Sequence, residues 1–192
     1  LHTSNFKAVD IDSKGGVWLS GARLLTRFDG KSFHDLPTIN RDNGKALFSI
    51  CNGVKEYDDH RFWVYTSNGL FLLDVRKNSF ERIMLNEQED TLHGFFINNV
   101  NDYLTTEQVL VTTDGGGTYV IDKGKRKVNI EASQEFINVA GNSFLVCAKK
   151  DDRNTVWAST INKQLVAVDL NKMKRKPFEV DKKAEAMLTA SV

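Results

Sequence analysis

The chain contains little cysteine and little proline, with two residues of each among its 192. Two cysteines, Cys51 and Cys147, are too few for a disulfide framework, and we expect both to be unpaired thiols in the core. Neither sign of charge dominates, because 26 basic residues are matched by 25 acidic ones. This balance gives no indication of nucleic acid as a partner.

Long apolar runs and helical patterns are missing as well. No uninterrupted apolar run reaches the roughly 18 residues that suggest a membrane span. No segment keeps apolar residues at i, i+3, i+4 and i+7 for three turns, so the sequence predicts no helix. The chain begins at Leu1 without a signal-peptide pattern, from which we expect a mature form or an excised piece.

The chain does contain a fourfold repeat. In each copy, an apolar pair ending in Trp or Leu is followed by a turn and then by an apolar strand that ends in Asp. The anchors are 45, 47 and 47 residues apart and the closing Asp residues 45, 48 and 47 apart. The anchors are Trp18, Trp63, Leu110 and Trp157, and the closing residues are Asp29, Asp74, Asp122 and Asp169.

A period of roughly 40–50 residues made of short strands is typical of propeller blades. The sequence therefore predicts an all-β fold, a β-propeller of four four-stranded blades. The expected blades cover residues 6–36, 47–83, 96–130 and 142–180, with fourth strands at 33–36, 80–83, 128–130 and 178–180. Residues 184–192 resemble the first strand of a fifth blade. This strand either closes a small four-bladed ring or, as we expect, continues an arc of a larger propeller of about seven blades. The Trp rings are expected to fill the wedges between neighbouring sheets.

Catalytic and metal-binding patterns are not found. The four His residues lack metal-ligand spacing, and we interpret the cluster at 58–60 (Asp-Asp-His) as a solvated hairpin turn rather than a cation site. The glycines at 115–117 predict a turn rather than a phosphate cradle. The basic stretches at 123–127 and 172–176 are expected to be exposed outer turns. We predict no catalytic residue, no metal and no cofactor.

Candidate ligand contacts come from loops. In a propeller, the turns between second and third strands open on the same face as the connections between blades, and function concentrates on such loops. Polar side chains expected there could hydrogen-bond sugar hydroxyls, although ordinary wet loop residues would look the same. The candidates are Arg23, Asn68, Asp114, Asn162, Lys163, Arg41 and His93.

The first two repeats resemble the two-component regulator propeller repeat. The first matches it with Asp12, Gly15, Trp18, Phe28, Asp29, Gly30, Lys31 and Phe33. The second matches it with Asp58, Trp63, Thr66, Asn68, Gly69, Leu70, Asp74 and Phe80. The third and fourth keep the frame but lose the Gly-Leu pair, and the third also lacks the Trp.

This resemblance implies a non-catalytic sensor propeller in the periplasmic part of a hybrid two-component histidine kinase of the Bacteroidetes type, with any kinase outside this segment. It also implies an oligosaccharide or other small ligand and further propeller blades of the same polypeptide as partners. An isolated arc is expected to self-associate, for instance as a homodimer. The alternatives are a protein-interaction propeller without a small ligand and a propeller lyase or lactonase.

Overall fold

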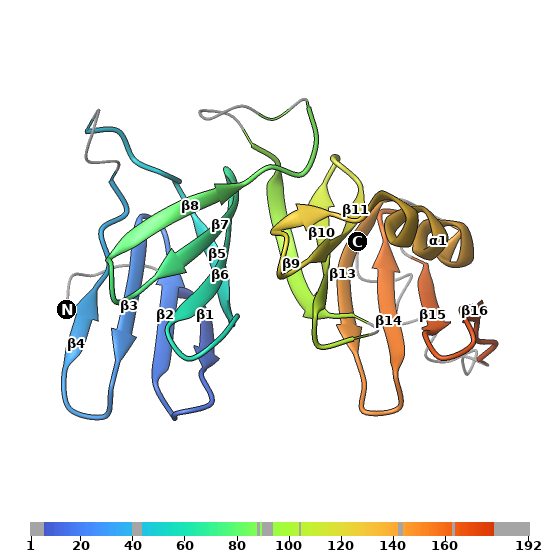
Figure 1. Ribbon diagram of the computed structural model, residues 1–192, viewed down its shortest axis with the longest axis horizontal. Coiled ribbons are helices and arrows are strands. Elements are labelled where there is room, and N and C mark those ends of the chain that lie inside the picture. Colours follow the sequence, from blue (N-terminus) through green and yellow to red (C-terminus); the bar gives the residue numbers. More distant parts are fainter. Residues whose placement is uncertain are drawn as a thin grey trace.

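A computed structural model describes residues 6–39, 44–87, 89, 94–103, 105–141, 144–162 and 164–178. Four separate four-stranded antiparallel sheets follow one another along the chain, and in each sheet the strands pair in sequence order (Figure 1). The fold is therefore the predicted array of propeller blades.

The sheets account for nearly all of the regular structure. Blade 1 contains β1 (Phe6–Ile11), β2 (Val17–Gly21), β3 (Leu24–Phe28) and β4 (Phe33–Asp35). Blade 2 contains β5 (Cys51–Glu56), β6 (Arg61–Thr66), β7 (Gly69–Asp74) and β8 (Ser79–Ile83). Blade 3 contains β9 (Phe96–Asp102), β10 (Gln108–Asp114), β11 (Thr118–Asp122) and β12 (Lys127–Val128). Blade 4 contains β13 (Leu145–Lys150), β14 (Thr155–Thr160), β15 (Leu165–Asp169) and β16 (Lys174–Arg175).

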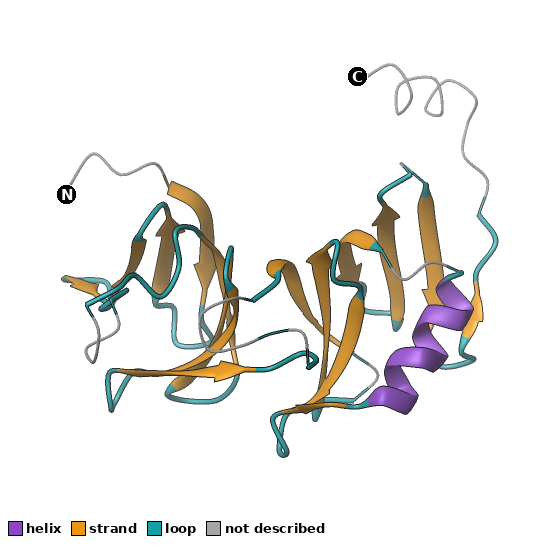
Figure 2. Ribbon diagram, turned by 90° about the horizontal axis from the view of Figure 1, so that it is seen from above, coloured by secondary structure: helices purple, strands orange, loops and turns teal. Residues whose placement is uncertain are grey.

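The four blades form an open arc (Figure 2). The first strands lie on its inner side, where β1 contacts β5, β5 contacts β9, and β9 contacts β13. The fourth strands lie on the convex side. The first strand of each blade thus faces the space that would be the central channel of a closed propeller.

The anchor residues occupy one register position in every blade. Each lies on the second strand, between a polar residue of the first strand and a residue of the third. The pairings are Trp18 with Asp10 and Arg27, Trp63 with Lys55 and Leu72, Leu110 with Asn101 and Val120, and Trp157 with Lys149 and Ala167. The repeat in the sequence is therefore a repeat in strand register.

The apolar core lies between the blades rather than within one sheet. Trp18 packs on Phe62 of blade 2, with ring centroids 4.4 Å apart. Trp63 belongs to a buried cluster with Val109 of blade 3, and Leu110 to a cluster with Val156 of blade 4. The anchors of blades 1 to 3 thus pack with the second strand of the following blade.

Trp157 differs from the other two Trp residues. Trp18 is 1% exposed and Trp63 is 0% exposed, whereas Trp157 is only half-buried. The expectation of equal burial is wrong for Trp157, because no described sheet follows blade 4. Its ring instead packs against Phe178 at 5.4 Å.

The helix α1 (Ile130–Ala140) was not predicted. Asn129 caps its N-terminus by accepting a hydrogen bond from the Ala132 amide, and Gly141 ends it in the left-handed conformation. Its buried residues are Ser133, Phe136 and Ala140, so two of the three are small and the apolar periodicity is weak. Among the described residues, no helix is long and apolar enough to cross a membrane.

Two predicted fourth strands are also wrong. In blade 3 the strand ends at Val128, because Asn129 starts the helix where residues 128–130 were expected to continue the sheet. In blade 4 the fourth strand is β16 at Lys174–Arg175, ahead of the predicted 178–180, and the segment 184–192 lies outside the described residues.

The prediction of two core thiols holds for one of them. Cys51 is buried, and burial raises the pKa of its thiol to about 12, whereas Cys147 is exposed. The strand register explains the difference. Cys51 pairs with Thr66, and the equivalent residue of blade 4 that pairs with Thr160 is Leu145. Cys147 follows the bulge and takes the position that Gly53 holds in blade 2.

Replacing the buried Trp63 by Ala should lower the free energy of unfolding by about 3–5 kcal/mol, as large-to-small changes in packed cores do. Trp157→Ala is the matched variant at the same register, and it should cost clearly less because its ring is half-buried. Urea denaturation measures both. Equal losses, or a loss below about 1 kcal/mol for Trp63→Ala, would contradict the packing described here.

Candidate functional site

The turns between second and third strands lie on one edge of the arc, the upper edge in Figure 1, as the sequence predicted. The predicted ligand residues at these turns are Arg23, Asn68, Asp114 and Asn162. Lys163, Arg41 and His93 lie outside the described residues. Of the four that are described, none lines either of the two hollows described below.

Two of these residues hold loops in place. The side chain of Asn68 accepts a hydrogen bond from the Gly94 amide at 3.0 Å and donates one to the Leu47 carbonyl at 3.1 Å. The backbone amide of Arg23 donates to the Ser49 carbonyl at 2.9 Å. Both residues therefore fix the connections between blades to the turns, and their contact with a ligand stays a prediction.

A hollow of about 410 Å³ lies along the first strands and draws residues from all four blades. Each blade contributes the polar residue that lies opposite its anchor residue. These residues are Asp10, Lys55, Asn101 and Lys149. Tyr65 of β6 adds a phenol to the wall.

Most polar groups of this wall bind the neighbouring blade. Asp10 accepts a hydrogen bond from the Val54 amide at 2.9 Å, and the Lys55 ammonium lies 2.9 Å from an Asp102 carboxylate oxygen. Asn101 donates to the Ala148 carbonyl. Burial raises the pKa of Asp10, and the effect is opposed by the Val54 amide and by the positive charge of Lys149.

Sequence reasoning missed this hollow, although a signal was present. Asp10, Lys55, Asn101 and Lys149 follow one another at intervals of 45, 46 and 48 residues, in step with the anchors. The apolar anchors and the closing Asp residues define the repeat, and a single polar residue in each first strand also fits the ordinary alternation of a half-buried strand. A polar residue that recurs on every inner strand marks the channel wall of a propeller.

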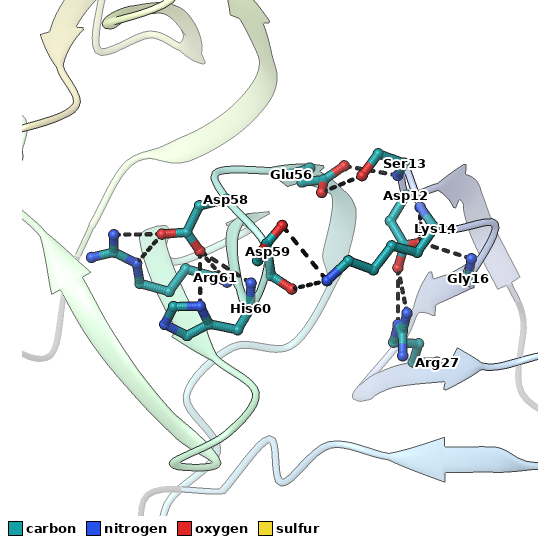
Figure 3. A network of polar contacts seen from close by, with 10 residues as sticks. All are labelled: Asp12, Ser13, Lys14, Gly16, Arg27, Glu56, Asp58, Asp59, His60 and Arg61. Carbon is teal, nitrogen blue, oxygen red and sulfur yellow. Dashed lines mark hydrogen bonds and ion pairs between the residues drawn. The ribbon is translucent and has the colours of Figure 1, made fainter.

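A second hollow lies at the opposite edge, between the hairpins of blades 1 and 2 (Figure 3). The Glu56 carboxylate accepts from the amide and the hydroxyl of Ser13, and Lys14 pairs with Asp59 at 3.6 Å. These contacts join the two hairpins. His60 and its neighbouring acids form the predicted turn, and among the described residues no group of acids, His and Cys could hold a metal ion.

Asp12 organises the hairpin of blade 1 and is also drawn in Figure 3. One carboxylate oxygen accepts from the amides of Lys14 and Gly16, at 3.1 and 2.7 Å. The other accepts from the indole of Trp18 at 3.1 Å and from the Arg27 guanidinium at 2.8 Å. Burial opposes ionisation, but these hydrogen bonds outweigh it and lower the pKa of Asp12.

Blade 4 repeats this arrangement. Asp151 accepts from the amides of Arg153 and Thr155 and from the Trp157 indole at 3.1 Å. Blade 2 departs from it, because Asp58 turns to Arg61 and the Trp63 indole nitrogen has no hydrogen-bond partner among the described residues. In blades 1 and 4, the six-residue spacing between Asp and Trp in the sequence thus places the two side chains within hydrogen-bonding distance.

Taken together, the sheets, their register and the inner polar wall define an open arc of a β-propeller. Two solved structures with this fold are extracellular domains of proteins described as hybrid two-component systems of B. thetaiotaomicron. They are BT3049 (TM-score 0.66, 16% identity) and BT4673 (TM-score 0.64, 17% identity). The WD40 β-propeller domain of Doa1 is also similar, with a TM-score of 0.64 and 9% identity.

These matches cover 93%, 94% and 95% of this chain but only 25%, 22% and 55% of the other chains. The chain thus spans about a quarter of the length of the two-component domains. No protein-family model and no curated protein matches the sequence. The solved structures match the resemblance seen in the sequence, at the level of the fold.

Asp12→Asn should lower the free energy of unfolding by about 2–3 kcal/mol, because an amide would direct donor hydrogens toward the Trp18 indole and Arg27. The lowered pKa of Asp12 means that its contribution is present above the ordinary value of 3.8 and lost as the pH falls below it. Urea denaturation at several pH values should therefore show the two proteins converging in acid. Asp152→Asn, in an exposed turn, is the charge-matched control, and a difference that persists in acid would contradict the assignment.

Proposed function

We propose that this chain is part of the ligand-sensing propeller of an extracytoplasmic, periplasmic region of a hybrid two-component regulator. The observation that carries the proposal is the match of nearly the whole arc to extracellular domains of two such systems. Asp12 and Trp18, which belong to the sequence resemblance, add support because they form the hairpin bond of blade 1, and Asp151 and Trp157 repeat this bond in blade 4. The proposed ligand is an oligosaccharide, bound without chemical change.

The proposed mode of action is binding rather than catalysis. The acid–His group at Asp58 to His60 is occupied by its own turn, since Asp58 accepts from the amides of His60 and Arg61 and from the Arg61 guanidinium. A lyase or lactonase would need such groups directed at a substrate. In our proposal, a bound ligand acts by changing how the propeller contacts its neighbours.

Both ends of the arc present apolar faces suited to further blades. Val9 is 62% exposed, whereas Val54, its equivalent in blade 2, is 4% exposed because blade 1 covers it. The half-buried Trp157 presents the surface that Trp18 presents to Phe62. The exposed face of blade 1 therefore corresponds to the face of blade 2 that blade 1 covers, and the exposed face of blade 4 corresponds to the face of blade 1 that covers blade 2. We propose that further blades of the same polypeptide cover both end faces.

Binding to a glycan array tests the sensor function. The probe is the longest soluble polypeptide that contains residues 1–192. We expect binding to particular oligosaccharides, and chromatography of the bound glycan should recover it unchanged. Cleavage of the glycan would favour the enzyme alternative, and failure to bind any oligosaccharide would favour a protein-interaction propeller.

Light scattering tests the coverage of the end faces. The 192-residue chain should self-associate with rising concentration, because exposed apolar faces such as that of Val9 and Ile11 drive association. Val9→Lys with Ile11→Lys should reduce this association, while the same substitutions in the longer polypeptide should destabilise it. A monomer at all concentrations would contradict the proposal.

A further inference from the structure

The hollow along the first strands holds polar groups that the fold does not use. Asp10 bonds the Val54 amide through one carboxylate oxygen, and among the described residues its other oxygen has no hydrogen-bond partner. Lys149 reaches the same hollow from blade 4 and likewise makes no hydrogen bond or ion pair with a described residue. A carboxylate and an ammonium group therefore share the hollow without closing on each other.

Tyr65 is the strongest sign of a site. Its side chain is almost completely buried, with 8% of the residue exposed, yet its hydroxyl has no hydrogen-bond partner among the described residues. The ring is buried, but the hydroxyl is not among the buried polar atoms that lack a partner, so it opens onto the hollow and can bond a ligand there. Burial, with the nearby charge of Asp10, raises the pKa of Tyr65, so the phenol keeps its proton and can donate it.

The backbone beneath Tyr65 is shaped for this hydroxyl. A Cβ atom on Gly53 would stand 2.2 Å from the hydroxyl oxygen, so only glycine lets the phenol reach the first strand. The equivalent positions in blades 3 and 4 are Asn99 and Cys147. Because Tyr65 of the second strand passes close to Gly53, its hydroxyl reaches the channel wall formed by the first strands.

The rest of the wall is held rigidly. The Lys55–Asp102 ion pair joins blades 2 and 3, and the Asn101 amide bonds Asn99 on its own strand and the Ala148 carbonyl of blade 4. These groups are already bonded, so the free ones stand on a fixed frame. A set of polar groups around a hollow of about 410 Å³ fits small-molecule sites, which span roughly 300–1,000 Å³.

The free groups define the chemistry of a ligand. Asp10 needs a donor, Lys149 needs an acceptor, and the Tyr65 hydroxyl serves as either. Hydroxyl groups are donors and acceptors at once, so a ligand with several of them satisfies all three residues. The two free charges are opposite, so a ligand with net charge would gain at one of them and lose at the other.

We propose that this hollow, enclosed by the first strands and Tyr65, is a binding site for a neutral, hydroxyl-rich small molecule of monosaccharide size. Asp10 accepts hydrogen bonds from its hydroxyls, Lys149 donates to them, and Tyr65 completes the set. The site is separate from the loop edge predicted from the sequence. It rests on its own geometry, so it holds or fails independently of the oligosaccharide array.

Isothermal titration calorimetry with the longest soluble polypeptide containing residues 1–192 tests this site. The probes are free glucose, galactose, mannose, xylose and arabinose, with glycine as a zwitterion and acetate as an anion. At least one sugar should bind, and it should bind more tightly than either glycine or acetate. Tyr65→Phe should weaken sugar binding about 3–10-fold and Asp10→Asn about 10–100-fold, by loss of neutral and charge-assisted hydrogen bonds.

Tyr57→Phe is the matched control, because the Tyr57 hydroxyl donates to the Lys123 carbonyl at 3.0 Å and lies outside this hollow. It should lower the melting temperature without changing sugar affinity. Tyr65→Phe should leave the melting temperature nearly unchanged, since no described protein group bonds the hydroxyl. The proposal is overturned if no sugar binds, if only glycine or acetate binds, or if the sugar affinity falls with Arg23→Ala and Asn162→Ala but not with Tyr65→Phe.

Discussion

In blades 1 and 4, a carboxylate that closes the first hairpin also holds the anchor Trp in place, and this is the local constraint behind the packing of the sheets. Asp12 and Asp151 each bind two turn amides and the indole of the Trp six residues later, which fixes the ring relative to its own sheet. A second set of carboxylates caps the third-to-fourth-strand turns, where Asp29 accepts from the amides of Lys31 and Ser32. A Trp held in this way fills the gap before the next blade, so a local turn sets the spacing between sheets.

Polar and apolar contacts between blades occupy different parts of each interface. Toward the middle of each interface, anchors such as Trp18 and Trp63 bury apolar surface. Along the first strands, single polar residues such as Asp10 and Asn101 bond the backbone of the next blade. This division gives the inner wall directional contacts that set the register of neighbouring blades, and it leaves polar atoms available on the channel side.

Much of the fold could be predicted, because the anchors and the closing Asp residues make short-range contacts that show in the sequence. Three features could not. The helix α1 buries small residues such as Ser133 and Ala140, which give little apolar periodicity. The exposure of Cys147 depends on a bulge that shifts the register by one residue, and the half-burial of Trp157 depends on the absence of a described following sheet. The inner hollow gathers residues from four blades, and only their common spacing links them along the chain.

The helix α1 makes the coupling between blades uneven. It packs on β11 of blade 3 and on β15 and β16 of blade 4, and Figure 2 shows it on the convex side. Separating blades 3 and 4 must therefore break the helix packing on one of them, such as the contact of Phe136 with Tyr103 on the blade 3 side, as well as the interface between the sheets. The stability of a repeat protein is approximately the sum of the stabilities of its repeats and of the interfaces between neighbouring repeats. Because the helix strengthens the interface between blades 3 and 4, these two blades should unfold as a single cooperative unit.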